Sequence, residues 1–193
     1  MPSPYFAARI PPLTIIALVF AIPLFATNEA VAQSCSERQP TRITGPGPHD
    51  FSYGVSDPVL WRDGDGGEPL VLRGRVLDTC GKPVANALVR IVHANENGDH
   101  IADRWRAHLN TDASGQFRVV TVLPGYTAGL PRHMHFIIEH PEHRRLMTHL
   151  YFKNDPLAEP GAEDLSLVLE EVQREDRRGW LSNFEFVLEG TGG

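Results

Sequence analysis

Cysteine is scarce in this chain, because Cys35 and Cys80 are the only two among its 193 residues. No C-x-x-C, G-x-S-x-G or Walker motif is present either, so these common signatures of redox, hydrolytic and nucleotide chemistry are missing. The sequence also lacks a basic patch, and its formal net charge is −6. An acidic chain of this kind excludes nucleic acid as an expected partner.

The first 32 residues have the composition of a secretory signal peptide. Arg9 provides a short positive segment, residues 13–25 are almost wholly apolar, and Ala30-Val31-Ala32 has the form of a cleavage site. The apolar run is short and interrupted by proline, which disfavours a membrane span, although an uncleaved anchor is the alternative. We therefore expect a periplasmic or secreted protein that has no membrane association after cleavage.

Both cysteines lie after the expected cleavage site. In an oxidising compartment, a disulfide between Cys35 and Cys80 is the natural pairing, and two free thiols are the alternative. Residues 33–69 are rich in proline, glycine and serine, and we interpret them as an extended N-terminal arm. The disulfide would fasten this arm to the first hairpin of a single domain at residues 70–193.

From residue 70 onward, short apolar segments alternate with turn signals, which predicts an all-β fold built as an antiparallel β-sandwich. The segment at residues 163–172 fits either a short helix or a further strand. Within the second segment, Val89, Ile91 and His93 are expected to share one face. The expected strands lie at residues 70–77, 87–93, 116–122, 133–138, 146–152 and 183–188.

The most informative feature is the segment His133-Met134-His135-Phe136. Successive side chains of a strand point to opposite faces, so both imidazoles project from one face and Met134 and Phe136 from the other. Two neighbouring imidazoles suit a transition metal. Eight of the nine histidines fall between residues 93 and 149, which favours a metal centre over satisfied surface or core histidines.

An ordered series of motifs resembles the intradiol ring-cleavage dioxygenase family. The resemblance implies a β-sandwich that holds one Fe(III) through two tyrosines and two histidines, and that cleaves a catechol-type ring with O2 to a muconate-type product. Prealbumin-like modules share the front half of the pattern, so a plain interaction module is an alternative. The motifs lie at residues 74–95, 111–117, 123–126, 133–136 and 148–152, with a further match at residues 179–188.

The resemblance assigns roles to particular residues. It makes His133 and His135 the histidine ligands and Tyr126 the second tyrosine, and it places Arg132 near a family arginine, so that Tyr126 and Arg132 take catalytic roles. The position of the first tyrosine holds His100. Two further histidines, His93 and His149, are candidates for additional ligands or for groups that hydrogen-bond to the ligands.

Histidine at position 100 changes the chemistry that the resemblance implies. Phenolate oxygens stabilise Fe(III), and a neutral imidazole in place of one of them favours a lower oxidation state, or else Cu²⁺ or Zn²⁺. The resemblance as a whole still implies an Fe(III) intradiol dioxygenase that acts on a catechol-type substrate with O2, and this is the function that we expect. The alternative is a metal-binding β-sandwich without ring cleavage, and a homo-oligomer is left open for both.

Overall fold

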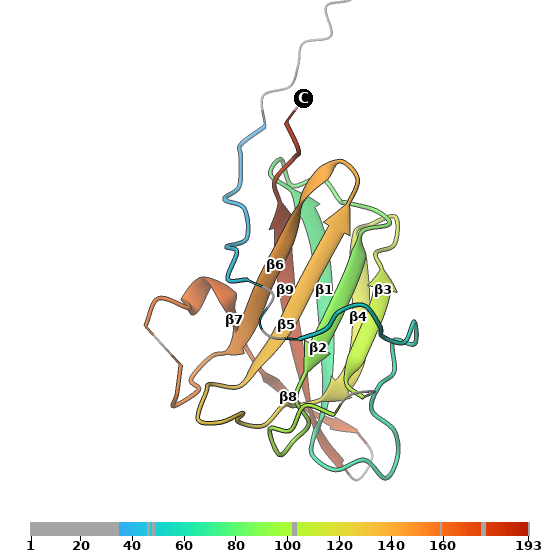
Figure 1. Cartoon of the computed structure of the whole chain (residues 1–193), viewed down its shortest axis with the longest axis vertical. Helices are drawn as coiled ribbons and strands as arrows, with labels where there is room; N and C mark the ends of the chain where they lie inside the picture. Colours follow the sequence, from blue (N-terminus) through green and yellow to red (C-terminus); the bar gives the residue numbers. More distant parts are fainter. Residues whose placement is uncertain are drawn as a thin grey trace, which may run out of the picture. The chain divides into compact units, whose positions relative to one another are not determined.

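The computed structural model describes residues 35–45, 47, 49–101, 104–158, 160–174 and 177–192 (Figure 1). The predicted signal peptide at residues 1–32 lies outside the described residues. In the part of the chain that the structure describes, no helix is long and apolar enough to cross a membrane. The described residues belong to one compact unit that begins at Cys35.

Strands dominate this unit, and they form two sheets with the orders β4-β1-β9-β8 and β3-β2-β5-β6-β7 (Figure 1). A short 3₁₀ turn, η1 (Glu163–Leu165), precedes β7. The strands among the described residues are β1 (Pro69–Asp78), β2 (Leu88–His93), β3 (Arg106–Asn110), β4 (Gln116–Val122), β5 (His133–His140), β6 (His143–Phe152), β7 (Ser166–Leu167), β8 (Glu170–Arg174) and β9 (Arg177–Leu188).

The all-β sandwich predicted from the sequence is confirmed. Alternating apolar side chains from the two sheets meet in one core, where burial of their surface provides the main stabilisation. Two pairings, β1 with β9 and β6 with β7, are parallel and were not indicated by the turn signals. Fully buried residues of this core include Leu70, Leu72, Val89, Ile91, Met134, Phe136 and Phe186.

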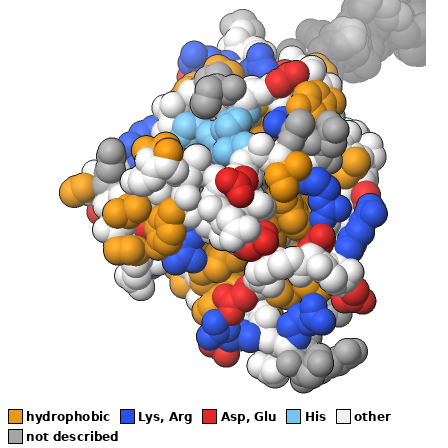
Figure 2. Space-filling model, turned by 60° about the horizontal axis from the view of Figure 1, so that its bottom comes forward, with side chains coloured by type: hydrophobic (Ala, Val, Ile, Leu, Met, Phe, Trp, Pro, Cys, Tyr) orange, Lys and Arg blue, Asp and Glu red, His pale blue; other side chains and the backbone are white. Residues whose placement is uncertain are grey.

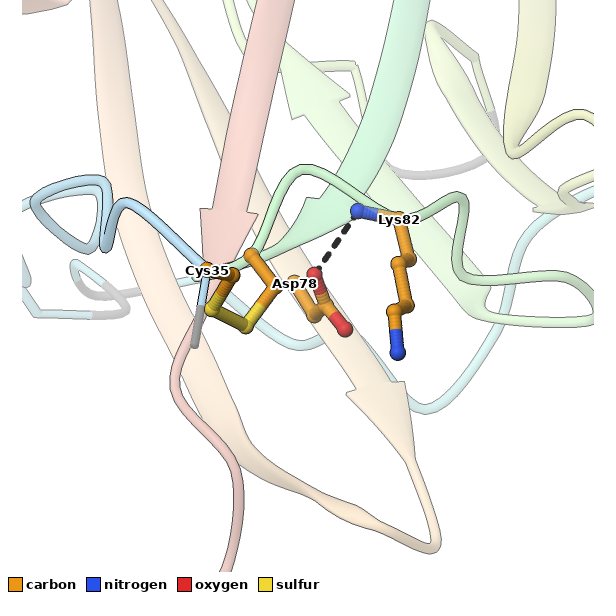
Figure 3. The surroundings of a disulfide bond; sticks show 4 residues. Cys35, Asp78 and Lys82 are labelled. Carbon is orange, nitrogen blue, oxygen red and sulfur yellow. Dashed lines mark hydrogen bonds between the residues drawn. A yellow bond between two sulfur atoms is a disulfide. The ribbon is translucent and has the colours of Figure 1, made fainter. Parts of the chain in front are cut away.

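The N-terminal arm is fastened at its beginning by a disulfide. Cys35 is bonded to Cys80 in the turn after β1, with the two Cα atoms 5.3 Å apart (Figure 3). In the same turn, the backbone N–H of Lys82 donates to the carboxylate of Asp78 at 2.8 Å. The predicted disulfide is therefore confirmed, and it joins the arm to the loop after β1 as expected.

The arm then crosses the outer face of the five-stranded sheet (Figure 1). The backbone N–H of Thr44 donates to the carbonyl of Met147 on β6 at 3.0 Å. Farther along, Phe51 is buried against Val92 and Ile137, which belong to the outer face of β2 and β5. The sandwich therefore carries a second, smaller apolar cluster between the sheet and the arm, outside the main core.

Candidate metal centre

Five histidines meet on the outer face of the five-stranded sheet, where they line a cavity of about 560 Å³. His133 and His135 come from β5, and His149 of β6 pairs directly with His135 in the sheet. His100 comes from the loop that follows β2, and His49 comes from the arm. Figure 2 shows the histidine side chains gathered on one face, with hydrophobic side chains beside them.

Three of these histidines form a compact triad. One ring nitrogen from each of His49, His100 and His135 lies within 4.8 Å of the other two. Metal–nitrogen bonds of about 2.0–2.1 Å place the ligand nitrogens of one ion about 3–4 Å apart. A small rotation of the rings would therefore close the triad around a single metal ion.

The hydrogen-bond pattern also points to a metal. His135 is 2% exposed, yet neither its Nδ1 nor its Nε2 has a hydrogen-bond partner among the described residues. The same holds for Nδ1 of His100 and Nε2 of His149. A buried polar atom without a partner costs about 1–3 kcal/mol, so native proteins rarely keep several of them together without a ligand. These nitrogens fit a bound metal ion.

Burial favours the neutral form of four imidazoles of the cavity, those of His49, His100, His135 and His149. Burial, followed by the positive charge of neighbouring groups, lowers the pKa of both His100 and His149 to about 4. Burial, and next the proximity of His133, lowers the pKa of His135 still farther. Burial and Arg106 lower the pKa of His49. Since metals bind the neutral imidazole, these side chains are ready to bind without first losing a proton.

His133 lies beside the triad, with its ring centroid 4.7 Å from that of His135. Its Nδ1 donates a hydrogen bond to the carbonyl of Pro131 at 2.7 Å. This bond fixes the ring orientation and leaves Nε2 as the nitrogen with a free lone pair, an arrangement typical of metal-binding histidines. The structure therefore brings four of the predicted residues together: His100, His133, His135 and His149.

The structure places Tyr126 and Arg132 outside this cavity. Nη2 of Arg132 donates to the Tyr126 hydroxyl at 3.0 Å, and both residues line a separate hollow. The physical reason is the course of the loop before β5. The N–H of Gly125 donates to the Asn95 carbonyl at 2.8 Å, and the Thr127 hydroxyl donates to the Gly98 carbonyl at 2.9 Å. These bonds hold Tyr126 where its hydroxyl meets Arg132.

A different tyrosine, Tyr151, lines the histidine cavity. It follows His149 by two residues on β6 and pairs with His133 across the sheet. The alternation of β6 puts it on the same face as His149. The predicted strand at residues 146–152 alternates in the same way, so the sequence pattern by itself places Tyr151 on the face of His149, whereas the resemblance assigns the ligand role to Tyr126.

His93 lies on the opposite, inner face of the sheet, as expected from the face that it shares with Val89 and Ile91. It is 1% exposed, and its pKa is lowered to about 4 by burial. As a neutral ring, it donates from Nδ1 to the Ala94 carbonyl and accepts at Nε2 from the Thr121 hydroxyl, both at 2.7 Å. Both nitrogens are satisfied within the core, so the structure does not bring His93 to the cavity.

The sequence interpretation missed His49, because it is the one histidine outside the cluster at residues 93–149. A usable signal was present. His49 follows the Thr44-Gly45-Pro46 element, which resembles a segment that precedes the domain in the dioxygenase family. This signal associates the arm with the domain, but the position of an extended arm on a sheet depends on contacts distant in sequence, so the signal does not show which arm residue meets the β5 histidines.

Comparisons with known proteins match this chain to dioxygenases. A family model described as "Dioxygenase" matches residues 44–190. The chain is 34% identical over 117 residues to catechol 1,2-dioxygenase 2 of Acinetobacter lwoffii, covering 48% of this chain and 42% of that protein. It is 38% identical over 111 residues to the protocatechuate 3,4-dioxygenase beta chain of Burkholderia cepacia, covering 47% of each. The chain thus spans about half the length of the curated relatives it matches.

Among solved structures, the dioxygenase domain of a dioxygenase–carbohydrate-binding protein fusion from Streptomyces sp. SirexAA-E is similar to this chain. The TM-score is 0.67 at 28% identity, and the match covers 78% of this chain and 99% of that one. 3-Chlorocatechol 1,2-dioxygenase of Rhodococcus opacus 1CP shares the fold, with a TM-score of 0.69 at 24% identity, over 84% of this chain and 76% of that one.

Proposed function

Because the chain belongs to the intradiol ring-cleavage dioxygenase family, we propose that it is a metal-dependent oxidoreductase that cleaves a catechol-type ring with O2. The observation that carries this proposal is the cavity of about 560 Å³ in which five histidines surround space for one aromatic ring. Ligand sites of a few hundred Å³ are typical for small molecules. The expected product is a muconate-type dicarboxylic acid.

Iron is the metal that family membership supports, and the donor set supports its binding through imidazole nitrogens. Imidazole suits iron, copper and zinc alike, so Cu²⁺ and Zn²⁺ are the alternatives. The bound ion would supply the chemistry that makes a coordinated catechol reactive toward O2. Since the Tyr126 hydroxyl is bonded to Arg132 outside the cavity, this set favours the divalent state more strongly than a two-tyrosinate set.

The protein's own side chains would orient the substrate. Leu130, Pro131 and Pro160 provide apolar surface in the cavity wall, against which the flat face of an aromatic ring can pack. The buried Nε2 of His149 has no other partner in the described structure and can hydrogen-bond a ring hydroxyl. Arg42 at the cavity is already paired with Asp164 at 2.7 Å, so its charge is largely neutralised. These features suit an uncharged catechol.

Export to the periplasm or the medium is part of the proposal. It is supported by the signal-like composition of the first 32 residues and by the Cys35–Cys80 disulfide. Structural disulfides persist in oxidising compartments and are rare in the cytosol. Detection of the mature chain in the periplasmic or culture fraction, cleaved after Ala32, tests this part of the proposal.

Oxygen uptake and ultraviolet absorption test the proposed reaction. Protein produced by export and loaded with Fe²⁺ is mixed with catechol, protocatechuate or hydroxyquinol in air. We expect equal molar consumption of O2 and substrate, with muconate-type absorption appearing in step. The His135→Ala variant should lose the activity, and His140→Ala, outside the cavity, should keep it. Metal-loaded protein that consumes no O2 with any of these substrates would overturn the assignment.

A metal-binding protein without ring cleavage is the second candidate. The placement of Tyr126 favours this second candidate. The resemblance assigns Tyr126 as a metal ligand, but its hydroxyl accepts a hydrogen bond from Arg132 outside the cavity. This candidate predicts tight metal binding with no turnover of any catechol. The same assay therefore separates the two functions.

A further inference from the structure

The arm is anchored to the sheet on both sides of His49. Before it, the Thr44 hydroxyl accepts from the backbone N–H of His149 at 2.9 Å. After it, the carbonyl of Asp50 accepts from the guanidinium of Arg106 on β3, and Phe51 is buried against Val92 and Ile137. These contacts anchor the arm on both sides of His49, whose ring lies against that of His135 on β5.

Gly47 allows the arm to approach the site closely. Its φ is +68°, and a Cβ atom at this position would lie 2.7 Å from Cε1 and 2.8 Å from Nδ1 of His135. Neither the backbone conformation nor the space suits a larger residue. The backbone at Gly47 therefore lies directly against the His135 ring, whose two nitrogens have no hydrogen-bond partner among the described residues.

His49 is positioned against both remaining members of the triad. Its ring centroid is 4.1 Å from that of His100, in a stacked arrangement, and 4.3 Å from that of His135, in an edge-to-face arrangement. The His49 and His100 rings are half-buried and close to the guanidinium of Arg106, and the His135 ring is buried. A metal ion shared by nitrogens of the three rings accounts both for their close approach and for the absence of a hydrogen-bond partner for His135 in the described structure.

We infer that His49 is a ligand of the same metal ion as His100 and His135, so that metal binding and docking of the N-terminal arm are coupled. The sheet and its loop provide part of the ligand set, and the docked arm completes it. Coupling of this kind is reciprocal: the ion tightens arm docking by the same factor by which the docked arm tightens metal binding. The inference shares with the proposed function the requirement for a bound metal ion, but it does not require that a ring is cleaved.

Zinc titration of the metal-free protein tests the inference, with the dissociation constant measured by competition against a chromogenic chelator. We expect one Zn²⁺ per wild-type chain. His49→Ala and His49→Gln each remove a primary ligand, so their affinity losses should reach at least about 10²-fold, the upper end of what loss of a ligand's hydrogen-bond partner costs. Gly47→Ala should weaken binding on the order of 10-fold by pushing the arm off His135. His140→Ala, a histidine outside the cavity, is the matched control and should bind within 2-fold of wild type.

Hydrogen–deuterium exchange measures the coupling in the wild-type protein itself, so this result does not depend on whether a variant folds. We expect Zn²⁺ to slow exchange in residues 42–51 of the wild type at least 10-fold, and to leave this segment unchanged in His49→Gln. Equal zinc affinity of His49→Gln and wild type, no zinc effect on the arm, or no zinc binding by the wild type would each overturn the inference. If the protein cleaves catechol but its zinc affinity does not change in His49→Gln, the inference fails and the proposed function stands. If zinc binding depends on His49 but no catechol is cleaved, only the proposed function fails.

Discussion

Two histidines that are almost equally buried lie on opposite faces of the same sheet. His93 on β2 is 1% exposed and His135 on β5 is 2% exposed. Both nitrogens of His93 are hydrogen-bonded, to Ala94 and to Thr121, whereas neither nitrogen of His135 has a partner in the described part of the chain. Burial alone therefore does not distinguish a structural histidine from a metal ligand. The distinguishing feature is whether its ring nitrogens have hydrogen-bond partners.

The two faces of β5 show the same difference on a larger scale. On the inner face, Met134 and Phe136 are fully buried in the apolar core between the sheets. On the outer face, His133 and His135 line the histidine cavity, which the arm also lines through Thr44, Gly47 and His49. The inner face packs against the second sheet and stabilises the fold, whereas the outer face is covered only in part by the arm and leaves space for a bound ion.

The largest effect is expected at His135. Replacing it by alanine removes a central ligand and should weaken metal binding on the order of 10³-fold, while the metal-free protein should be as stable as wild type or more so, because a buried unpartnered group is lost. Chelator competition and urea unfolding of the metal-free proteins measure the two quantities. A variant that binds metal normally would show that His135 is not a ligand.

The inner histidine should behave in the opposite way. His93→Ala leaves a cavity and an unpartnered Thr121 hydroxyl, so the free energy of unfolding should fall by about 2–4 kcal/mol. Metal affinity should stay within a few-fold of wild type, since His93 does not reach the cavity. Loss of metal from a folded His93→Ala protein would break the comparison between the two faces.

The pKa of His93 adds a pH dependence to stability. Burial lowers this pKa to about 4 in the folded protein, against 6.5 for the ordinary side chain. The folded state therefore resists protonation, and the stability contribution that is fully present above pH 6.5 is lost as the pH falls toward 4. The shift corresponds to about 3 kcal/mol. As the pH falls from 6.5 to 4, the free energy of unfolding of the metal-free wild type should decrease more steeply than that of His93→Gln. Parallel curves for the two proteins would contradict the assignment.

The smallest effect is expected at His149, which pairs with His135 in the sheet and has an unpartnered Nε2. It lies outside the closest triad, so we expect His149→Ala to weaken metal binding by about 10- to 100-fold. The same chelator competition measures this. An effect as large as that of His135→Ala would instead make His149 a principal ligand and revise the donor set.

Local patterns in the sequence were sufficient for the features that depend on neighbouring residues. Strict alternation placed the His133 and His135 side chains on one face and Met134 and Phe136 on the other, as the structure shows. Turn signals located most strands of the sandwich, and the only two cysteines pair as expected. These features follow from backbone geometry and from redox compartment, which a single sequence reveals.

Contacts between distant segments could not be predicted in this way. The short strand β3 has no clear alternation, and β9 joins β1 in parallel from the far end of the chain. The course of the loop at Gly125, which directs Tyr126 toward Arg132, depends on a bond to Asn95. The position of His49 beside His100 and His135 depends on where the arm crosses the sheet. In each case the deciding interaction joins residues far apart in the sequence.

X-ray absorption at the metal edge of the loaded protein tests the central claim most directly, since imidazole rings give distinctive multiple scattering. Wild-type protein should show at least three imidazole ligands with metal–nitrogen distances of about 2.0–2.1 Å. His49→Gln should lose one of them, and His93→Gln should lose none. A centre with two imidazoles or fewer completed by phenolate oxygen, unchanged in His49→Gln, would contradict an imidazole site completed by the arm.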